Sequence, residues 1–175
     1  SKKAINSVAD LKGLKFRAYN SATIRIAELT GMAPTKIEAA EISQAFSTGA
    51  VESMITSPTT GKNSKIWENG VGYFYDIAAW FPKNMVIVNK DAWNKLDSAT
   101  QKLIMSEAAL AERKGWDLSK KGNVADKKAL ADAGMKVGKV NSALQKHFQN
   151  VGATMADEWK AKAGARGVSV LAAYK

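Results

Sequence analysis

Cysteine is absent from this sequence of 175 residues, and histidine occurs only once, at His147. The missing cysteine excludes disulfides, thiolate metal ligands and a cysteine nucleophile. A zinc site would have to be built almost entirely from carboxylates, so we expect no metal. His147 lies beside Phe148 in a helical pattern, and no G-x-S-x-G turn accompanies it. We therefore expect no catalytic residue and interpret His147 as a surface or helix-packing residue.

Long apolar runs and glycine-rich turns are also missing. No run approaches the roughly 18 apolar residues of a membrane helix. Residues 1–5 contain no apolar stretch of a secretory signal and no initiator Met, so we expect a chain that begins after processing or is a piece of a longer protein. The turns at 20–22, 40–41 and 57–58 lack the glycines of a phosphate-binding loop, so we expect no nucleotide and no cofactor.

Basic residues are in excess, with 26 Lys and Arg against 16 Asp and Glu and a net charge of +10. The lysines are spread along the chain, and the densest pairs, Lys120-Lys121 and Lys127-Lys128, fall on predicted exposed helix faces. Such a surface attracts small anions. A polyanion- or nucleic-acid-binding domain is the alternative that the charge leaves open, although we expect no nucleic-acid partner.

The apolar pattern alternates between short strands and helices in the first part of the chain. Strands are predicted at 14–19, 35–39 and 51–56, with helices at 21–30 and 41–47 between them. This βαβαβ order predicts an α/β fold with a parallel sheet and covering helices.

The remaining residues predict two further strands and then long helices. The strands are expected at 73–79 and 84–89, and the uninterrupted apolar run 85–88 is typical of a strand buried on both faces. Asp97 begins a long helix that ends near Ala133. A second long helix begins after Asn141 and carries a regular apolar stripe that predicts core packing.

Arg17 stands at the end of the first predicted strand, directly before a helix. The carboxyl ends of parallel strands open onto the crevice where α/β folds bind ligands. A guanidinium there can hold a carboxylate through two parallel hydrogen bonds, and Asn20 can add a neutral one. An ordinary surface ion pair explains Arg17 equally well from the sequence alone. Trp80 and Phe81, at a bend between strands, fit either a core or the apolar wall of a pocket.

Several segments together resemble the solute-binding proteins of tripartite ATP-independent periplasmic (TRAP) transporters, of the dicarboxylate-binding-protein type. Residues 10–17 (DLKGLKFR) are similar to the family's DLKGLKxR, and residues 29–35 (LTGMAPT) to LGAxPT. Residues 41–52 (EISQAFSTGAVE) are similar to EVYxALQTGxVDG, and residues 86–96 to xxINKxxWxxLP. The segments occur in the family's order and at matching spacing, over residues 10 to about 140.

The resemblance implies a periplasmic receptor, not an enzyme, that captures an organic acid and delivers it to the membrane permease subunits. It implies that Arg17 forms the salt bridge to the ligand carboxylate and that Asn20 follows it in the site. The remaining expected ligand-binding residues are Tyr19 beside Arg17, Thr56 with Ser57 after the third strand, and Trp80 with Phe81 at the far end of the ligand. The resemblance also implies that this chain folds as an α/β lobe of the type II periplasmic-binding-protein kind, with long carboxy-terminal helices.

The chain departs from the family in two respects. Ala39 stands where sugar-acid binders carry an aromatic residue, and residues 55–58 (ITSP) replace their ENP, which favours an apolar or aromatic monocarboxylate over a polyhydroxylated acid. Family members are also roughly twice as long.

We therefore expect the carboxy-terminal half of a two-lobe protein, with the amino-terminal half as its partner. Its expected parts are a linker (1–10), a second-lobe α/β core (11–70), crossover strands returning to the first lobe (71–96), and a bridging helix with carboxy-terminal helices (97–175). The strands at 72–89 would then need a separate chain, a swapped assembly, or an exposed edge.

Overall fold

Three parallel strands form the centre of the fold in the computed structural model, which describes residues 1–79, 82 and 84–173. They are β1 (Lys15–Ala18), β2 (Ala33–Lys36) and β3 (Ser53–Met54), in the order β2-β1-β3. In this register Arg17 of β1 lies beside Thr35 and Met54. The predicted parallel sheet is confirmed, although β2 begins two residues earlier than expected. Its Pro34 is tolerated because β2 is an edge strand.

The helices that follow these strands begin and end at capping residues. A 3-10 helix, η1 (Val8–Leu11), precedes β1. Asn20 caps α1 (Ser21–Thr30) by accepting a hydrogen bond from Thr23 N at 2.9 Å, and Gly31 ends it in the left-handed conformation at φ 77°. After β2 come η2 (Ala39–Glu41) and α2 (Ile42–Ser47). After β3 come α3 (Pro58–Asn63) and η3 (Ile66–Asn69).

The first residues of the chain lie between this sheet and a second one. The second sheet pairs β4 (Tyr73–Tyr75) with β5 (Lys136–Gly138) in parallel. Ser1 and Tyr73 exchange backbone hydrogen bonds in both directions, at 2.9 and 3.1 Å. Lys2 N donates to Glu52 O at 2.8 Å. Residues 1–2 therefore bridge β3 and β4 at one end, and the reciprocal bonds with Tyr73 are those of an antiparallel pair.

Two apolar cores lie within this lobe. One joins β1 and α1 to η1 and the start of the last helix, and its most buried members include Leu11, Phe16 and Leu144. The other joins α2 and η3 to the end of the long helix, through Phe46, Ile66 and Leu130.

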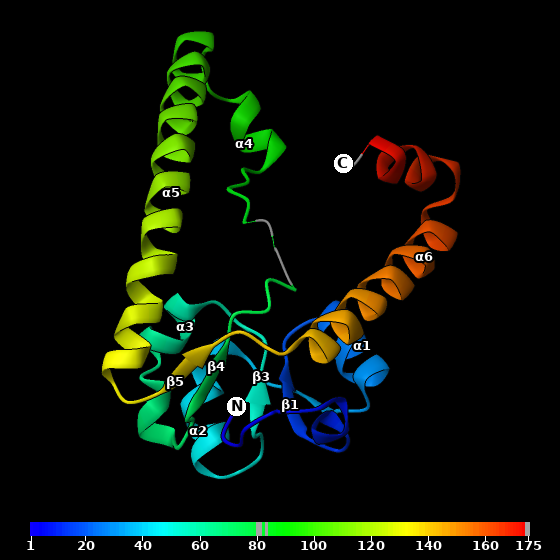
Figure 1. Ribbon diagram of the computed structural model, residues 1–175. Helices are drawn as coiled ribbons and strands as arrows, with labels where there is room; N and C mark the ends of the chain where they lie inside the picture. The colour runs from blue at the N-terminus through cyan, green and yellow to red at the C-terminus, as the bar shows by residue number, and fades with distance from the viewer. Residues whose placement is uncertain (80–81, 83, 174–175) are drawn as a thin grey trace.

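Two long helices extend from the lobe (Figure 1). A short helix, α4 (Lys90–Asn94), is followed by α5 (Ser98–Asp132), whose N-cap Asp97 accepts from Thr100 N. The last helix, α6 (Ser142–Ala173), is interrupted at Gly164. Both long helices were predicted. Arg25 of α1 forms hydrogen bonds to Glu158 through Nε and Nη2, which docks α6 on α1.

The prediction for residues 84–89 is wrong. These residues form no strand, and the apolar run 85–88, predicted to be buried on both faces, is exposed. The exposed fractions are 79% for Met85, 105% for Val86, 84% for Ile87 and 59% for Val88. In the described residues no neighbouring strand pairs with this segment, so its backbone and side chains have nothing to pack against. Figure 1 shows it leading into α4, apart from the two sheets.

Candidate ligand-binding site

Arg17 is buried at the carboxyl end of β1, with only 4% of its surface exposed. Its Nε donates to the carbonyl of Ile37 at 2.9 Å, and its guanidinium carbon lies 4.7 Å from the centre of the Tyr19 ring. Burial lowers the pKa of Arg17, while Tyr19 and Glu38 act in the opposite direction. The alternative of an ordinary exposed ion pair does not fit this environment.

The guanidinium keeps donors for a further partner. An arginine has five N–H groups, and the Nε group is the one directed at Ile37. Over the part of the chain that the structure describes, no carboxylate lies within salt-bridge distance of Arg17. A buried cation without a carboxylate partner is costly unless it is satisfied in some functional state. The arrangement is therefore suited to an anion that approaches the edge of the sheet.

Tyr19 and Asn20 stand next to Arg17 on the chain and are half-buried. The Asn20 side-chain oxygen is used by the helix cap, since it accepts from the Thr23 amide at 2.9 Å and from the Thr23 hydroxyl at 3.0 Å. This cap engages the side-chain oxygen of Asn20, while no hydrogen bond from its amide nitrogen occurs among the described residues. Tyr19 supplies the ring beneath the guanidinium.

Thr56 and Ser57 follow β3 at the same edge of the sheet, because β1 and β3 are parallel. Thr56 is half-buried and Ser57 is exposed. Ser57 is the N-cap of α3 and accepts from Thr60 N at 3.1 Å. The other two predicted site residues, Trp80 and Phe81, lie outside the described residues.

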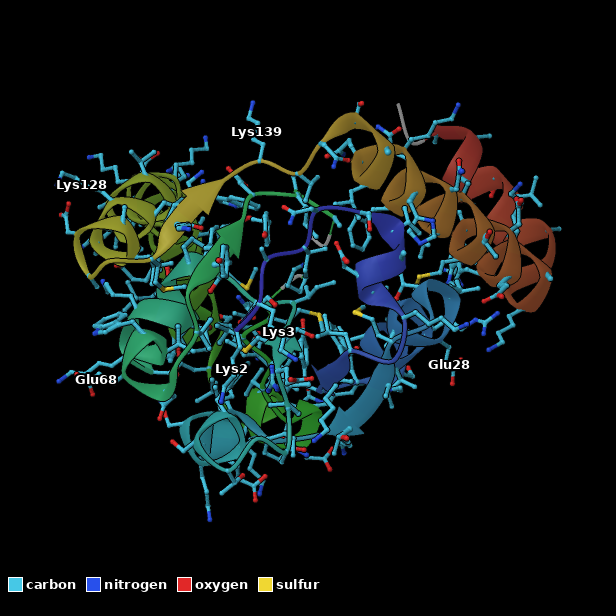
Figure 2. All side chains as sticks on the ribbon, turned by 60° about the horizontal axis from the view of Figure 1, so that its bottom comes forward. Lys2, Lys3, Glu28, Glu68, Lys128 and Lys139 are labelled. Carbon is cyan, nitrogen blue, oxygen red and sulfur yellow. The ribbon has the colours of Figure 1, made fainter. Side chains whose placement is uncertain are left out.

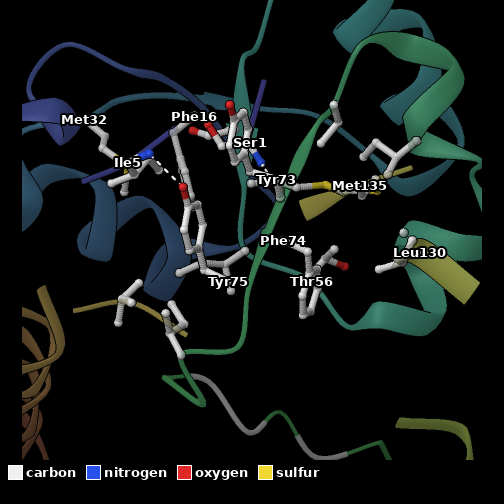
Figure 3. A pocket seen from close by; sticks show the side chains of 18 of the residues that line it. Ser1, Ile5, Phe16, Met32, Thr56, Tyr73, Phe74, Tyr75, Leu130 and Met135 are labelled. Atoms are coloured by element: carbon white, nitrogen blue, oxygen red, sulfur yellow. Dashed lines mark hydrogen bonds between the residues drawn. The ribbon is translucent and has the colours of Figure 1, made fainter. Parts of the chain in front are cut away.

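A cavity of about 120 Å³ lies away from Arg17, between the edges of β3 and β4 (Figure 3). Its lining is mostly apolar and includes Phe16, Tyr73, Tyr75, Leu130 and Met135. Of the predicted site residues that the structure describes, Thr56 alone contributes to it. Tyr75 closes one side, where its hydroxyl accepts from Ile5 N at 2.8 Å. The cavity is continuous with both cores, and among the described residues no charged side chain lines it, so we do not assign the carboxylate to it.

The positive charge is distributed over the molecule. Figure 2 shows Lys2 and Lys3, Lys128, and Lys139 at separate places on the surface. Several basic side chains are neutralised by acids, as in Lys127 with Asp76 at 2.7 Å. Within residues 1–79, 82 and 84–173, no cluster of three or more potential metal ligands occurs. The helices of these residues also lack the stretch of apolar sequence that a membrane-spanning helix requires.

Sequence reasoning missed two groups that contact Arg17 or the helix after Thr56 and Ser57. The Ile37 carbonyl, which orients Arg17, carries no side-chain signal. Asp126, 70 residues beyond Thr56 in the sequence, contacts the helix that follows Thr56. Nothing in the charged pattern of α5 distinguishes it from its neighbours.

The parallel sheet with covering helices and the arginine at its carboxyl edge define a lobe of the periplasmic-binding-protein class. The family model for bacterial extracellular solute-binding protein, family 7, matches residues 1–162. The chain belongs to this family, which includes TRAP solute-binding proteins, as the resemblance implied.

Solved structures of TRAP receptors are closely similar. One is an extracytoplasmic solute receptor from Bordetella pertussis that binds pyroglutamic acid, with 42% identity and a TM-score of 0.96, covering 99% of this chain and 57% of that one. Another is a marine metagenome TRAP solute-binding protein specific for pyroglutamate, with 37% identity and a TM-score of 0.94, at the same coverage.

A curated relative, the sialic acid-binding periplasmic protein SiaP of Vibrio cholerae, is 32% identical over 111 residues, which is 62% of this chain and 33% of SiaP. The chain thus spans little more than half the length of the solved relatives, and a third of SiaP is matched.

Proposed function

We propose that this chain is the part of an extracytoplasmic solute receptor that holds the carboxylate of a small organic acid. The observation that carries the proposal is Arg17, a buried guanidinium at the carboxyl edge of a parallel sheet without a carboxylate partner among the described residues. Its Nη groups grip the ligand carboxylate through two parallel hydrogen bonds. The receptor works in the periplasm, passes its ligand to the membrane permease subunits of a TRAP transporter, and performs no chemical reaction.

The ligand that we propose is a small monocarboxylate of the pyroglutamate class. Two receptors that bind pyroglutamate share 37% and 42% identity with this chain over 99% of its length. Asn20 and Tyr19, Thr56 and Ser57 provide polar contacts around the ring, and Trp80 and Phe81 its apolar wall.

We further propose that the chain forms one half of a two-lobe receptor. In this proposal the other half covers two surfaces of the chain. One is the exposed run 85–88. The other is formed by the facing edges of β3 and β4, which residues 1–2 bridge at one end only in the described structure. In this assembly residues 11–70 form the second-lobe core, 71–96 cross back to the first lobe, 97–175 bridge the lobes, and 1–10 enter from the first half. Ligand closure then takes place between the lobes.

A thermal-shift screen of the full-length receptor tests the ligand and its anchor. The acids are pyroglutamate, orotate and glucuronate, and the variants are Arg17→Gln and, as a matched control, Arg166→Gln on the exposed surface of α6. We expect pyroglutamate to raise the melting temperature of the parent protein and of the control, and not of Arg17→Gln. A shift that survives in Arg17→Gln contradicts the proposed anchor.

A second candidate function is a polyanion-binding domain, which the basic surface supports less well than Arg17 supports a carboxylate receptor. Its charges are dispersed and partly paired. A polyanion binder would bind any duplex DNA with an affinity that falls steeply with salt. We expect no such binding at physiological ionic strength, measured by fluorescence anisotropy.

A further inference from the structure

Asp126 is a buried carboxylate of α5, with 5% of its surface exposed. Its Oδ1 accepts a hydrogen bond from Lys62 Nζ at 2.5 Å, and its Oδ2 accepts one from Thr59 Oγ1 at 2.6 Å. Both donors belong to α3, so the carboxylate is satisfied by another helix. A buried carboxylate needs its pairing and hydrogen bonds. The contact therefore favours one position of α3 against α5.

A second contact lies one turn further along α5. Leu130 is fully buried and packs where Gly61 of α3 has no side chain. A Cβ at Gly61 would lie 3.7 Å from Leu130 Cδ2, which is ordinary van der Waals contact, so the two helices are close here. Asp126 and Leu130 are four residues apart and share one face of α5. Helix α3 therefore packs on this face of α5 through a polar contact at Asp126 and an apolar contact at Leu130.

The position of α3 determines the position of Thr56 and Ser57. The helix has only six residues, Pro58–Asn63, which is too short to be stable without tertiary contacts. Strand β3 ends at Met54, so the sheet does not hold residues 55–57 in a ladder. Ser57 is bound instead to the first turn of α3, through its hydrogen bond from Thr60 N.

We propose that Asp126 is a positioning residue for the ligand site, which it serves by clamping α3 to α5 through Thr59 and Lys62 and so fixing Thr56 and Ser57 at the carboxyl edge of the sheet. This inference rests on the proposed function. It adds a contribution from the long helix to a site whose other described residues belong to the sheet and its turns. Asp126 itself does not touch the ligand.

The first test is hydrogen exchange on the ligand-free, full-length protein. The variant is Asp126→Asn, and the matched control is Asp132→Asn, an exposed acid of the same helix that pairs with Lys128 at 2.6 Å. We expect faster exchange in α3 for Asp126→Asn, with α1 unchanged, and no change for Asp132→Asn. Equal exchange in α3 for both variants overturns the clamp, whether or not the ligand is known.

The second test is isothermal titration with pyroglutamate on the same proteins. We expect Asp126→Asn to weaken binding roughly tenfold, about the cost of ordering one or two loosened side chains, here Thr56 and Ser57, when the ligand binds, and Asp132→Asn to bind like the parent. Thr59→Val and Thr59→Ser give an independent pair if Asp126→Asn does not fold. Thr59→Val removes the hydroxyl that donates to Asp126, so we expect it to weaken ligand binding. Thr59→Ser keeps the hydroxyl, so we expect it to bind like the parent.

The outcomes separate the inference from the function on which it rests. If Arg17→Gln abolishes binding while Asp126→Asn and Thr59→Val bind like the parent, the clamp has no part in the site and the anchor stands. If the parent fails to bind pyroglutamate, the proposed ligand class is wrong, and the exchange experiment still decides whether Asp126 holds α3.

Discussion

Replacing Arg17 by lysine keeps the positive charge and removes the planar fork, so it separates charge from geometry. In the folded protein Arg17 Nε donates to the Ile37 carbonyl at 2.9 Å, and the guanidinium lies 4.7 Å from the Tyr19 ring centre. Lysine has three donors at a single nitrogen and cannot make two parallel bonds to a carboxylate while bonding Ile37.

Two losses follow, and they appear in different measurements. The donor of the bond to the Ile37 carbonyl is charged, so losing this bond costs about 1.5–3 kcal/mol of folding free energy. This loss lowers the melting temperature of a domain of 150–250 residues by roughly 3–12 °C, and that of the longer full-length receptor by less. Losing one charged hydrogen bond to the ligand costs about 1.5–3 kcal/mol, which weakens binding about 10- to 150-fold.

Titration calorimetry with pyroglutamate, and differential scanning calorimetry without it, measure these two effects on the full-length receptor. The matched control is Arg166→Lys on the exposed surface, for which we expect neither change. If Arg17→Lys binds pyroglutamate as tightly as the parent, charge alone holds the ligand and the two-bond geometry is refuted.

Three further predictions concern the elements around the site. Asn20→Ala removes the cap of α1 and lowers the free energy of unfolding by about 0.5–2 kcal/mol in urea titrations, whereas Asn20→Asp preserves it. The hydrogen bonds from Lys62 and then Thr59 lower the pKa of Asp126. Its contribution to stability is therefore present above the ordinary carboxyl range and lost as the pH falls below about 4, and we expect Asp126→Asn to reduce this acid sensitivity in unfolding titrations. Finally, Val86→Lys with Ile87→Lys should reduce concentration-dependent association of the 175-residue chain in analytical ultracentrifugation without lowering its melting temperature, because both side chains are exposed. If the double variant associates as strongly as the parent chain, then residues other than Val86 and Ile87 form the associating surface.

Local signals in the sequence were sufficient for the elements with clear caps and periodicity. The helix predicted over 21–30 has these bounds as α1, and the long helix α5 begins after Asp97 as predicted. The order of strands and helices predicted the parallel sheet. These features depend on interactions within a few residues, which a single sequence displays directly.

Features that depend on distant partners could not be predicted in this way. The burial of Arg17 depends on Tyr19 and on the Ile37 carbonyl beyond β2, and alternation alone left a surface ion pair equally possible. The run 85–88 reads as a buried strand because its side chains are apolar, but burial requires neighbours that the described residues do not supply. The contact of Asp126 with Thr59 joins residues 67 positions apart, so no local pattern reveals it.

The most direct measurement is a crystal structure of the full-length receptor with its bound acid. The account predicts both carboxylate oxygens of the ligand about 2.7–2.9 Å from the two Nη atoms of Arg17, with Nε still bonded to the Ile37 carbonyl. A ligand whose carboxylate is held by other residues, with Arg17 turned toward a protein acid, would contradict it.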